Sequence, residues 1–426
     1  MLSDLKTLNL LNSGIISLVS IALQSAFLFA PSASAHKLFP STTSEGVQYA
    51  QHLLSVDDRI ALKNLYFSKN NFSDSALVLE CYALNFSVMG WYSQAIDAAY
   101  AATRKAPKNP HIAATVAYVL GVNKGNNTAL RIVDKCLKDY PLDARSRAIK
   151  AEILFALGNE ENVDRLLESA KKLDPESFDV VSAQNLIWVK RLEKDKALRV
   201  VNDFLMSHPK NIRALIARAE LNKQLSRFNS AIDDTDTILS IMPNHIFAVA
   251  LKADLLKHSK KYNQSAVLYR KYASLATNDG DRLLANEGLA NVLEASGMIA
   301  SATNARKLVV LSQSKTTRCT SKSEALNVIK LTRNLMLEKK WSEAIKQTDR
   351  VLGRYPDMAE AIEERAQCLE NLGKFALAIK EISKLLELHN DYSDWYRWRA
   401  RLHQKLGNMP AALKDLRRAS ELDGAL

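Results

Sequence analysis

Apolar residues recur every three or four positions along most of this chain, which is the spacing of one face of an α-helix. In one clear stretch, Leu79 and Phe86 belong to a first apolar stripe, and Ala95 and Ala99 belong to a second. Gly90 stands between the two stripes, where a tight turn would fall. The pattern therefore predicts two helices that pack against each other in antiparallel directions.

This two-helix pattern repeats with a fixed period. Five prolines follow one another at intervals of 34 residues: Pro107, Pro141, Pro175, Pro209 and Pro243. Small or β-branched residues keep the same interval twelve positions earlier: Ala95, Ala129, Val163, Ala197 and Ala231. Because proline cannot continue a helix, each one marks the end of a second helix. The later units keep the apolar pattern after two insertions, one of three residues near 277–280 and one of eight residues at 312–322.

The repeated unit resembles the tetratricopeptide repeat, whose pattern is W-x₂-L-G-x₂-Y…A-x₃-F…P over 34 residues. The resemblance implies an all-α fold, an α-solenoid in which antiparallel helix pairs form a right-handed superhelix. Ten units can be followed, with a weaker leading pair of helices around Ala61. The chain departs from the family pattern in two ways. No unit has the first tryptophan, and the glycine after the leucine is usually alanine, as at Ala83.

The pattern divides the chain into five segments. We expect a signal peptide or membrane anchor at 1–35 and a linker at 36–56. A first repeat block of about seven units, preceded by the weak leading pair, covers 57–311. A polar loop at 312–322 separates it from a second block of three units at 323–426.

The first segment has the features of a secretory signal peptide. There is no charged residue from Thr7 to Ala30, Pro31 follows, and Ala33-Ser34-Ala35 offers a cleavage site before His36. This predicts an exported protein, periplasmic or secreted. An uncleaved anchor through residues 7–30 is the alternative, since about 20 apolar residues span a bilayer. In that case the chain would meet a membrane only through this segment.

The composition suits long helices, because only 13 glycines and 10 prolines occur in 426 residues. Most of the net charge of +12 comes from residues 210–322, which contain seventeen basic and nine acidic side chains. The charges are interspersed, which favours a solvated helical surface. Binding of nucleic acid or of an anionic surface by this section is the alternative. Export argues against nucleic acid as the partner.

Catalytic and metal-binding patterns are not found in the sequence. The four cysteines lie far apart, the eight histidines have no metal-ligand spacing, and no phosphate-binding or nucleophile motif occurs. We therefore expect no enzyme activity, cofactor, metal or small-molecule substrate. A disulfide between Cys319 and Cys368 is left open.

The resemblance implies a protein or peptide partner that binds in the groove lined by the first helix of each pair. Residues off the structural stripe of these helices are the candidates for contacting it: Arg213, Glu220, Lys223, Phe247, Asp254 and Lys257 in two adjacent units, and Lys330, Arg333, Arg397 and Arg401 in the later block. The alternative is that they are ordinary solvated helix residues.

The last helix has a charged stripe and an apolar stripe, so it could cap the array by itself. This predicts exposed side chains at Lys414, Arg417, Arg418 and Glu421, and buried side chains at Leu416 and Ala419. The alternative is that this end of the array is an interface with a partner.

Overall fold

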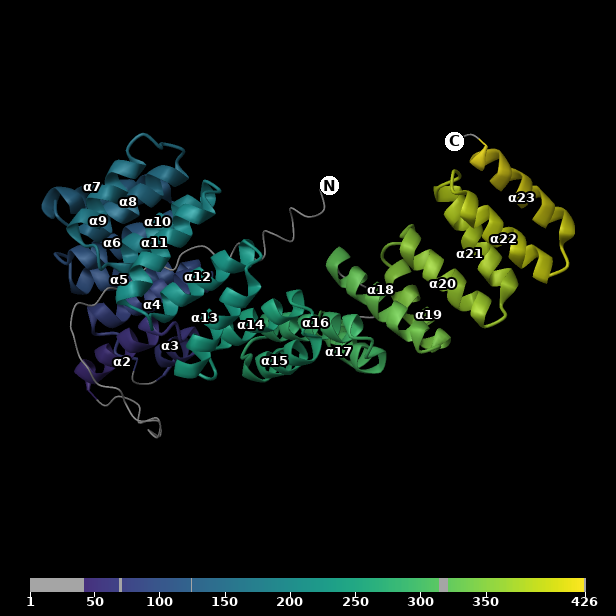
Figure 1. Ribbon diagram of the computed structural model, residues 1–426, viewed down its shortest axis with the longest axis horizontal. Coiled ribbons are helices and arrows are strands. Elements are labelled where there is room, and N and C mark those ends of the chain that lie inside the picture. The colour runs from purple at the N-terminus through teal and green to yellow at the C-terminus, as the bar shows by residue number, and fades with distance from the viewer. Residues whose placement is uncertain (1–41, 69–70, 124, 314–320, 425–426) are drawn as a thin grey trace. The chain divides into compact units, whose positions relative to one another are not determined.

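The computed structural model describes residues 42–68, 71–123, 125–313 and 321–424. The predicted leader at 1–35, its cleavage site and Cys319 lie outside these residues. Every regular element in the described part of the chain is a helix (Figure 1). Within that part, no helix is long and apolar enough to cross a membrane.

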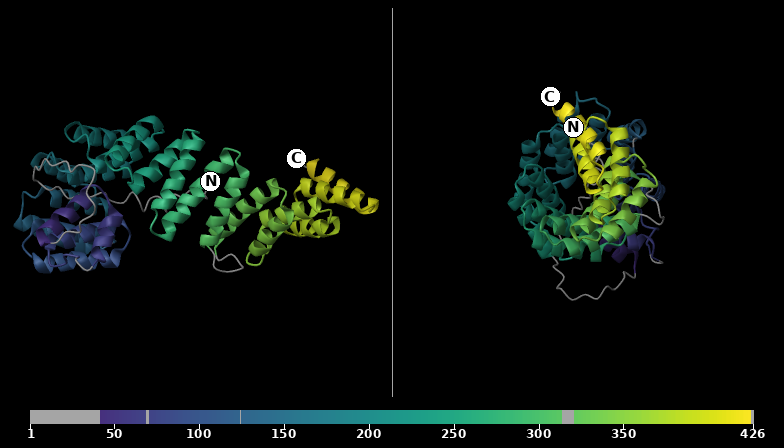
Figure 2. Two further views of the ribbon diagram at one scale, coloured as in Figure 1. Left: turned by 90° about the horizontal axis from the view of Figure 1, so that it is seen from below. Right: turned by 90° about the vertical axis from the view of Figure 1, so that its right-hand side faces the viewer.

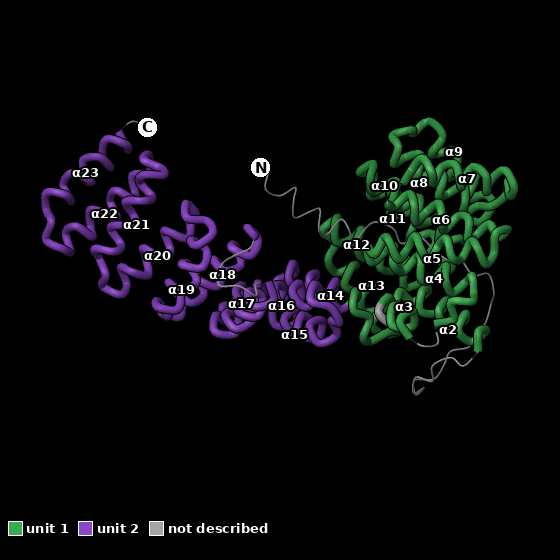
Figure 3. Tube along the Cα trace, turned by 180° about the vertical axis from the view of Figure 1, so that it is seen from behind, with its two compact units in different colours: residues 1–248 green, residues 249–426 purple. Residues whose placement is uncertain are grey.

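The chain forms two compact units, which Figure 3 distinguishes by colour; the first ends at Ala248. Its helices are α2 (Thr43–Ser55), α3 (Arg59–Tyr66), α4 (Ala76–Val88), α5 (Tyr92–Lys105), α6 (Pro110–Val122), α7 (Asn126–Asp139), α8 (Ala144–Ala156), α9 (Val163–Leu173), α10 (Phe178–Lys190), α11 (Lys194–Ser207), α12 (Ile212–Gln224), α13 (Phe228–Ile241) and the first residues of α14 (Ile246–His258). Consecutive helices lie side by side within the unit (Figure 2).

The second unit begins at Val249. It contains the rest of α14, α15 (Tyr262–Leu275), α16 (Asp279–Ala295), α17 (Ile299–Gln313), α18 (Lys322–Leu337), α19 (Trp341–Leu352), α20 (Ala359–Asn371), α21 (Phe375–Leu388), α22 (Ser393–Lys405) and α23 (Met409–Asp423). The two units together therefore have the all-α, α-solenoid fold that the sequence predicts.

The small residue of each second helix explains why the two helices of a pair can approach closely. All ten of these side chains are completely inaccessible: Ala95, Ala129, Val163, Ala197, Ala231, Ser265, Ala302, Ala344, Ala378 and Ala412. The periodicity of the sequence thus locates ten helix pairs correctly. A leading pair, α2 and α3, precedes them, and α2 lies in the segment 36–56 that was expected to be a linker.

An arginine on three of the first helices joins neighbouring repeats. Each bonds to a carboxylate sixteen residues later in its own pair and to a polar side chain sixteen residues earlier in the preceding pair. The three sets are Arg218 with Asp234 and Asn202, Arg365 with Glu381 and Asp349, and Arg399 with Asp415 and Ser383. These contacts fix the position of a first helix between two second helices.

The eight-residue insertion does not separate compact units in the structure. The Arg306 side chain of α17 is completely buried, and its guanidinium bonds to Glu294 of α16 at 2.8 Å and to Asn327 of α18 at 3.3 Å. Asn334 of α18 donates to the same Glu294 carboxylate at 2.8 Å. Helices α17 and α18 therefore belong to one unit, and the division between units falls at 248–249 instead of at 312–322.

Candidate partner-binding face

Four of the first helices that begin in unit 1 have a polar side chain at one recurring position, and a fifth has a phenylalanine. Five residues 34 positions apart occupy it: His111, Arg145, Asp179, Arg213 and Phe247. The sequence predicts that two of these residues, Arg213 and Phe247, line an open groove. Instead Arg145, Asp179 and Arg213 are only 3, 2 and 6% exposed.

A buried network accounts for the burial of Arg145. Its guanidinium lies 2.9 Å from a Glu80 oxygen of α4 and 3.1 Å from an Asp179 oxygen of α10. It also donates to the hydroxyl of Thr115 in α6 at 2.8 Å, and Thr115 donates to Glu80 at 2.6 Å. Burial raises the pKa of Asp179, an effect that the neighbouring Arg145 opposes. One arginine thus links the first helices of four successive repeats.

The turn between α2 and α3 lies near Arg213 and Phe247, the last two of the five residues at this repeat position. Val56 and Phe247 both pack against the apolar cluster that contains Ile212, and the Arg59 guanidinium lies 5.7 Å from the centre of the Phe247 ring. Arg213 lies over the ring of Phe178 at 5.0 Å, and burial lowers its pKa. Arg213, predicted to line an open groove, is therefore buried in this structure, and Phe247 is half-buried beside Arg59.

The other four candidates in this region are half-buried. Glu220 and Lys223 lie on α12, while Asp254 and Lys257 lie on α14 and form an ion pair at 2.5 Å. Tyr269 of α15 also hydrogen-bonds to Asp254, which with burial raises the pKa of the tyrosine. These side chains are held by neighbours within the fold.

The first helices of unit 2 present a different surface. We call the exposed side of α18, α20 and α22 the first-helix face. Leu337 of α18 is 66% exposed, and its neighbours on the face are also exposed: Leu326 and Arg333 of α18, Glu363 and Gln367 of α20, and Arg397 and Arg401 of α22. The face therefore combines accessible apolar and charged groups on three adjacent repeats.

Ion pairs orient the basic side chains of this face. The Arg333 guanidinium lies 2.6 Å from a Glu364 oxygen of α20, although the arginine side chain itself is 58% exposed. Arg397 pairs with Asp394 at 3.1 Å and also with Asp423 of α23. Because each arginine remains accessible, it can still donate to a carboxylate or a carbonyl group of a partner. Lys330 of α18 is half-buried and contributes less surface.

The structure adds residues that the sequence reasoning missed. Leu326, Glu363 and Gln367 lie on the first-helix face but were not selected, because only charged positions of α18 and α22 were chosen. Leu326 occupies the same repeat position as Arg145 and Asp179, so the 34-residue register could have identified it. Glu80 and Thr115 could not be found that way, since they are 35 residues apart.

The basic section at 210–322 gives less free positive charge than its composition indicates. Arg218 is paired with Asp234, Arg306 is buried against Glu294, and Arg213 is buried. Several of its seventeen basic side chains are thus neutralised or inaccessible. This distribution does not favour a continuous nucleic-acid surface, which requires accessible basic side chains along the phosphates.

Comparisons with known proteins agree with the helix-pair register. Residues 338–393 and 371–425 match a model of the tetratricopeptide repeat family. No curated protein matches the chain.

The solved structures that resemble the chain are distant from it. YrrB, described as a TPR protein with an unusual peptide-binding site, is 16% identical over 44% of this chain and 91% of its own, with a TM-score of 0.36. The type IV pilus biogenesis factor PilW is 16% identical over 47% of this chain and 92% of its own, with a TM-score of 0.40. A tetratricopeptide repeat protein of Parabacteroides merdae is 17% identical over 66% of this chain and 93% of its own, with a TM-score of 0.35.

The fold and the register of its small residues define the chain as a helical-repeat protein of the solenoid class. The family model matches 338–425, which contain α19 to α23, and identifies these helices as tetratricopeptide repeats. Proteins of this family bind protein or peptide partners.

Proposed function

We propose that the protein is an exported, non-enzymatic scaffold that binds a peptide or a segment of a partner protein on the first-helix face of unit 2. The observation that carries the proposal is the contrast between the units. Arg145, Asp179 and Arg213 are buried in unit 1, whereas the residue at the same repeat position of α18, Leu326, is exposed together with its neighbours on α18, α20 and α22. The accessible binding surface of the array would then be in its second half.

The chemistry of the face indicates which partner it fits. Arg333, Arg397 and Arg401 supply guanidinium donors, and Leu326 and Leu337 supply apolar contacts. An extended peptide with acidic side chains and a few large apolar residues would complement both. Arginine is favoured at such surfaces because its planar group can bind a carboxylate with two hydrogen bonds.

Export is part of the proposal and is supported by the sequence of the leader. The apolar run from Thr7 to Ala30 precedes a cleavage motif that ends at Ala35. A secreted or periplasmic location would place the scaffold among envelope or extracellular proteins.

Site-specific crosslinking tests where a partner binds. A photoreactive amino acid at Gln367, which is exposed on α20, should capture a partner when the full chain is produced in its own host. The same group at Lys380, which is exposed on the second helix α21, is the matched control. Equal capture at both positions, or capture only at Lys380, would refute the proposed face.

A further inference from the structure

The last helix of the array exposes a side that every comparable helix buries. The difference lies at the side chain four residues after the small residue of each second helix. Nine of these side chains are at most 6% exposed: Ala99, Val133, Leu167, Val201, Thr235, Tyr269, Arg306, Thr348 and Ile382. The tenth, Leu416 of α23, is 38% exposed. This corrects the prediction that Leu416 is buried, whereas Ala419 is buried as predicted.

Neighbouring positions on α23 show the same difference. Leu413 is 50% exposed, and Ser420 is exposed where the preceding helix α21 has the buried residue Leu386. We call Leu413, Leu416, Arg417 and Ser420 the terminal face. Its residues occupy the side that each preceding second helix buries.

The positive charge of Arg417 indicates what kind of helix could bind to the terminal face. In the two preceding repeats, the residue equivalent to Arg417 is Asp349 or Ser383, and each accepts a hydrogen bond from an arginine of the next first helix. At Arg417 the acceptor is replaced by a donor. A helix seated in the same way therefore needs a carboxylate where Arg365 and Arg399 stand in their own repeats.

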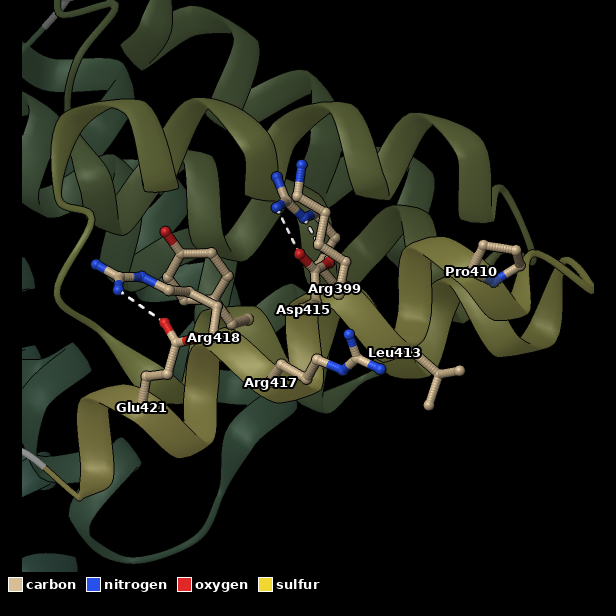
Figure 4. A pocket seen from close by; sticks show the side chains of 9 residues that line it. Arg399, Pro410, Leu413, Asp415, Arg417, Arg418 and Glu421 are labelled. Carbon is tan, nitrogen blue, oxygen red and sulfur yellow. Dashed lines mark hydrogen bonds and ion pairs between the residues drawn. The ribbon is translucent and has the colours of Figure 1, made fainter.

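The surroundings of Arg417 reinforce this requirement. Lys414 and Arg418 are exposed beside it, and Figure 4 shows the Arg417 and Leu413 side chains pointing away from α23 while Asp415 points toward Arg399. Arg418 is paired with Glu421 at 3.0 Å, whereas Lys414 and Arg417 are exposed and adjoin Leu413 and Leu416 in the sequence. Two copies of this face would bring like charges together, so a second copy of the chain fits it poorly.

We infer that the terminal face binds an acidic amphipathic helix of a partner protein, which packs apolar residues on Leu413 and Leu416 and places a carboxylate against Arg417. The helix would dock as an additional first helix. This inference rests on the proposed function as a scaffold, but it concerns a surface other than the first-helix face of α18, α20 and α22.

Two matched peptides test the inference on the full chain. The probe copies residues 392–406, which include α22, and carries Arg399→Glu; the control peptide keeps Arg399. Both are chemically stapled as helices and labelled for fluorescence anisotropy. We expect the Glu peptide to bind about tenfold more tightly than the Arg peptide, because it pairs with Arg417 and avoids a like-charge contact.

A charge reversal on the protein completes the test. Arg417→Asp should invert the preference between the two peptides, and Leu416→Asp should abolish binding of both. Circular dichroism confirms that both exposed-site variants remain folded. Failure of the Glu peptide to bind better, or a preference that survives Arg417→Asp, would overturn the inference. So would self-association of the chain that Leu416→Asp removes, because a second copy would then cover the face.

The peptide assay can fail without refuting the proposed scaffold function. Arg417→Asp does not touch Gln367 or the arginines of the first-helix face, so crosslinking at Gln367 should be unchanged in this variant. A failed peptide assay with retained crosslinking would refute only the terminal helix site.

Discussion

Arg145 and Asp179 occupy the same position of successive repeats, and their side chains form an almost completely buried ion pair at 3.1 Å. Such a pair makes the first helices of unit 1 part of the protein interior. Removal of one partner leaves the other charge buried without compensation, and this is more costly than loss of an exposed pair.

We expect Arg145→Ala to destabilise unit 1 by about 3–5 kcal/mol, because Glu80 and Asp179 would remain buried without their cation. Arg131→Ala on the exposed side of α7 is the matched control and should change the free energy of unfolding by less than about 0.5 kcal/mol. Urea denaturation measures both. Similar values for the two variants would mean that Arg145 does not form its ion pairs with Glu80 and Asp179 in solution.

The turn between the two helices of a pair supplies a second prediction. Gly90, Gly158, Gly297, Gly373 and Gly407 adopt φ values of 71° to 76° there, but Leu192, Ser226, Lys260 and Lys339 are held at 57° to 64° in the same turn. A side chain is strained at positive φ by about 1 kcal/mol or more. Leu192→Gly should therefore stabilise the protein by about 1 kcal/mol, measured as an increase in the free energy of unfolding. Leu142→Gly, at an exposed residue outside that turn, should not stabilise it.

Burial of Glu152 predicts a pH dependence. Its Oε1 atom has no hydrogen-bond partner in the described residues, and burial raises the pKa of the carboxyl from 4.5 to about 8. A carboxyl whose pKa is higher in the folded state takes up a proton on folding between these pKa values. Its favourable contribution to stability is therefore complete at low pH and is lost as the pH rises toward about 8, by about 1.4 kcal/mol for each unit of pKa difference.

Glu152→Gln should reduce this loss of stability with rising pH, because the amide does not titrate. Thermal denaturation at several pH values between about 4.5 and about 8.5 measures the slope. Glu161→Gln is the control, since Glu161 is exposed and should leave the slope unchanged. A slope that is the same in all three proteins would show that Glu152 is hydrated.

The leader predicts a defined mature terminus. If Ala33-Ser34-Ala35 is the cleavage site, the exported protein begins at His36. Mass spectrometry of the protein recovered outside the cytosol determines this terminus. Recovery of Met1 on a membrane-bound form would indicate the uncleaved anchor, and recovery of Met1 on a cytosolic form would contradict export.

The repeat register was predictable because it depends on local sequence. The small residue of each second helix and the proline at its end recur at a fixed distance, and every small residue is buried as expected. The helix α2 was missed because it lies outside this register. Its capping box, formed by Thr42 and Glu45, was a local signal that could have revealed it.

The openness of the groove could not be predicted from the register alone. Arg213 is buried beside Phe178, and Asp57 and Arg59, more than 150 positions earlier, are close enough to influence its pKa. Leu416 is exposed although its helix is amphipathic, because burial at that position requires a helix of the next repeat. Whether a groove position is covered thus depends on contacts between distant repeats, and helix amphipathicity does not report them.

The most direct test of the central claim is the affinity of the partner captured at Gln367 for two triple variants. One variant replaces Arg333, Arg397 and Arg401 with serine on the first-helix face; the other replaces Arg270, Lys346 and Lys380 with serine on exposed second helices, so both lose three positive charges. We predict that the first variant raises the dissociation constant by about tenfold or more, and that the second raises it by less than about threefold. Equal weakening in both would contradict a binding site on α18, α20 and α22.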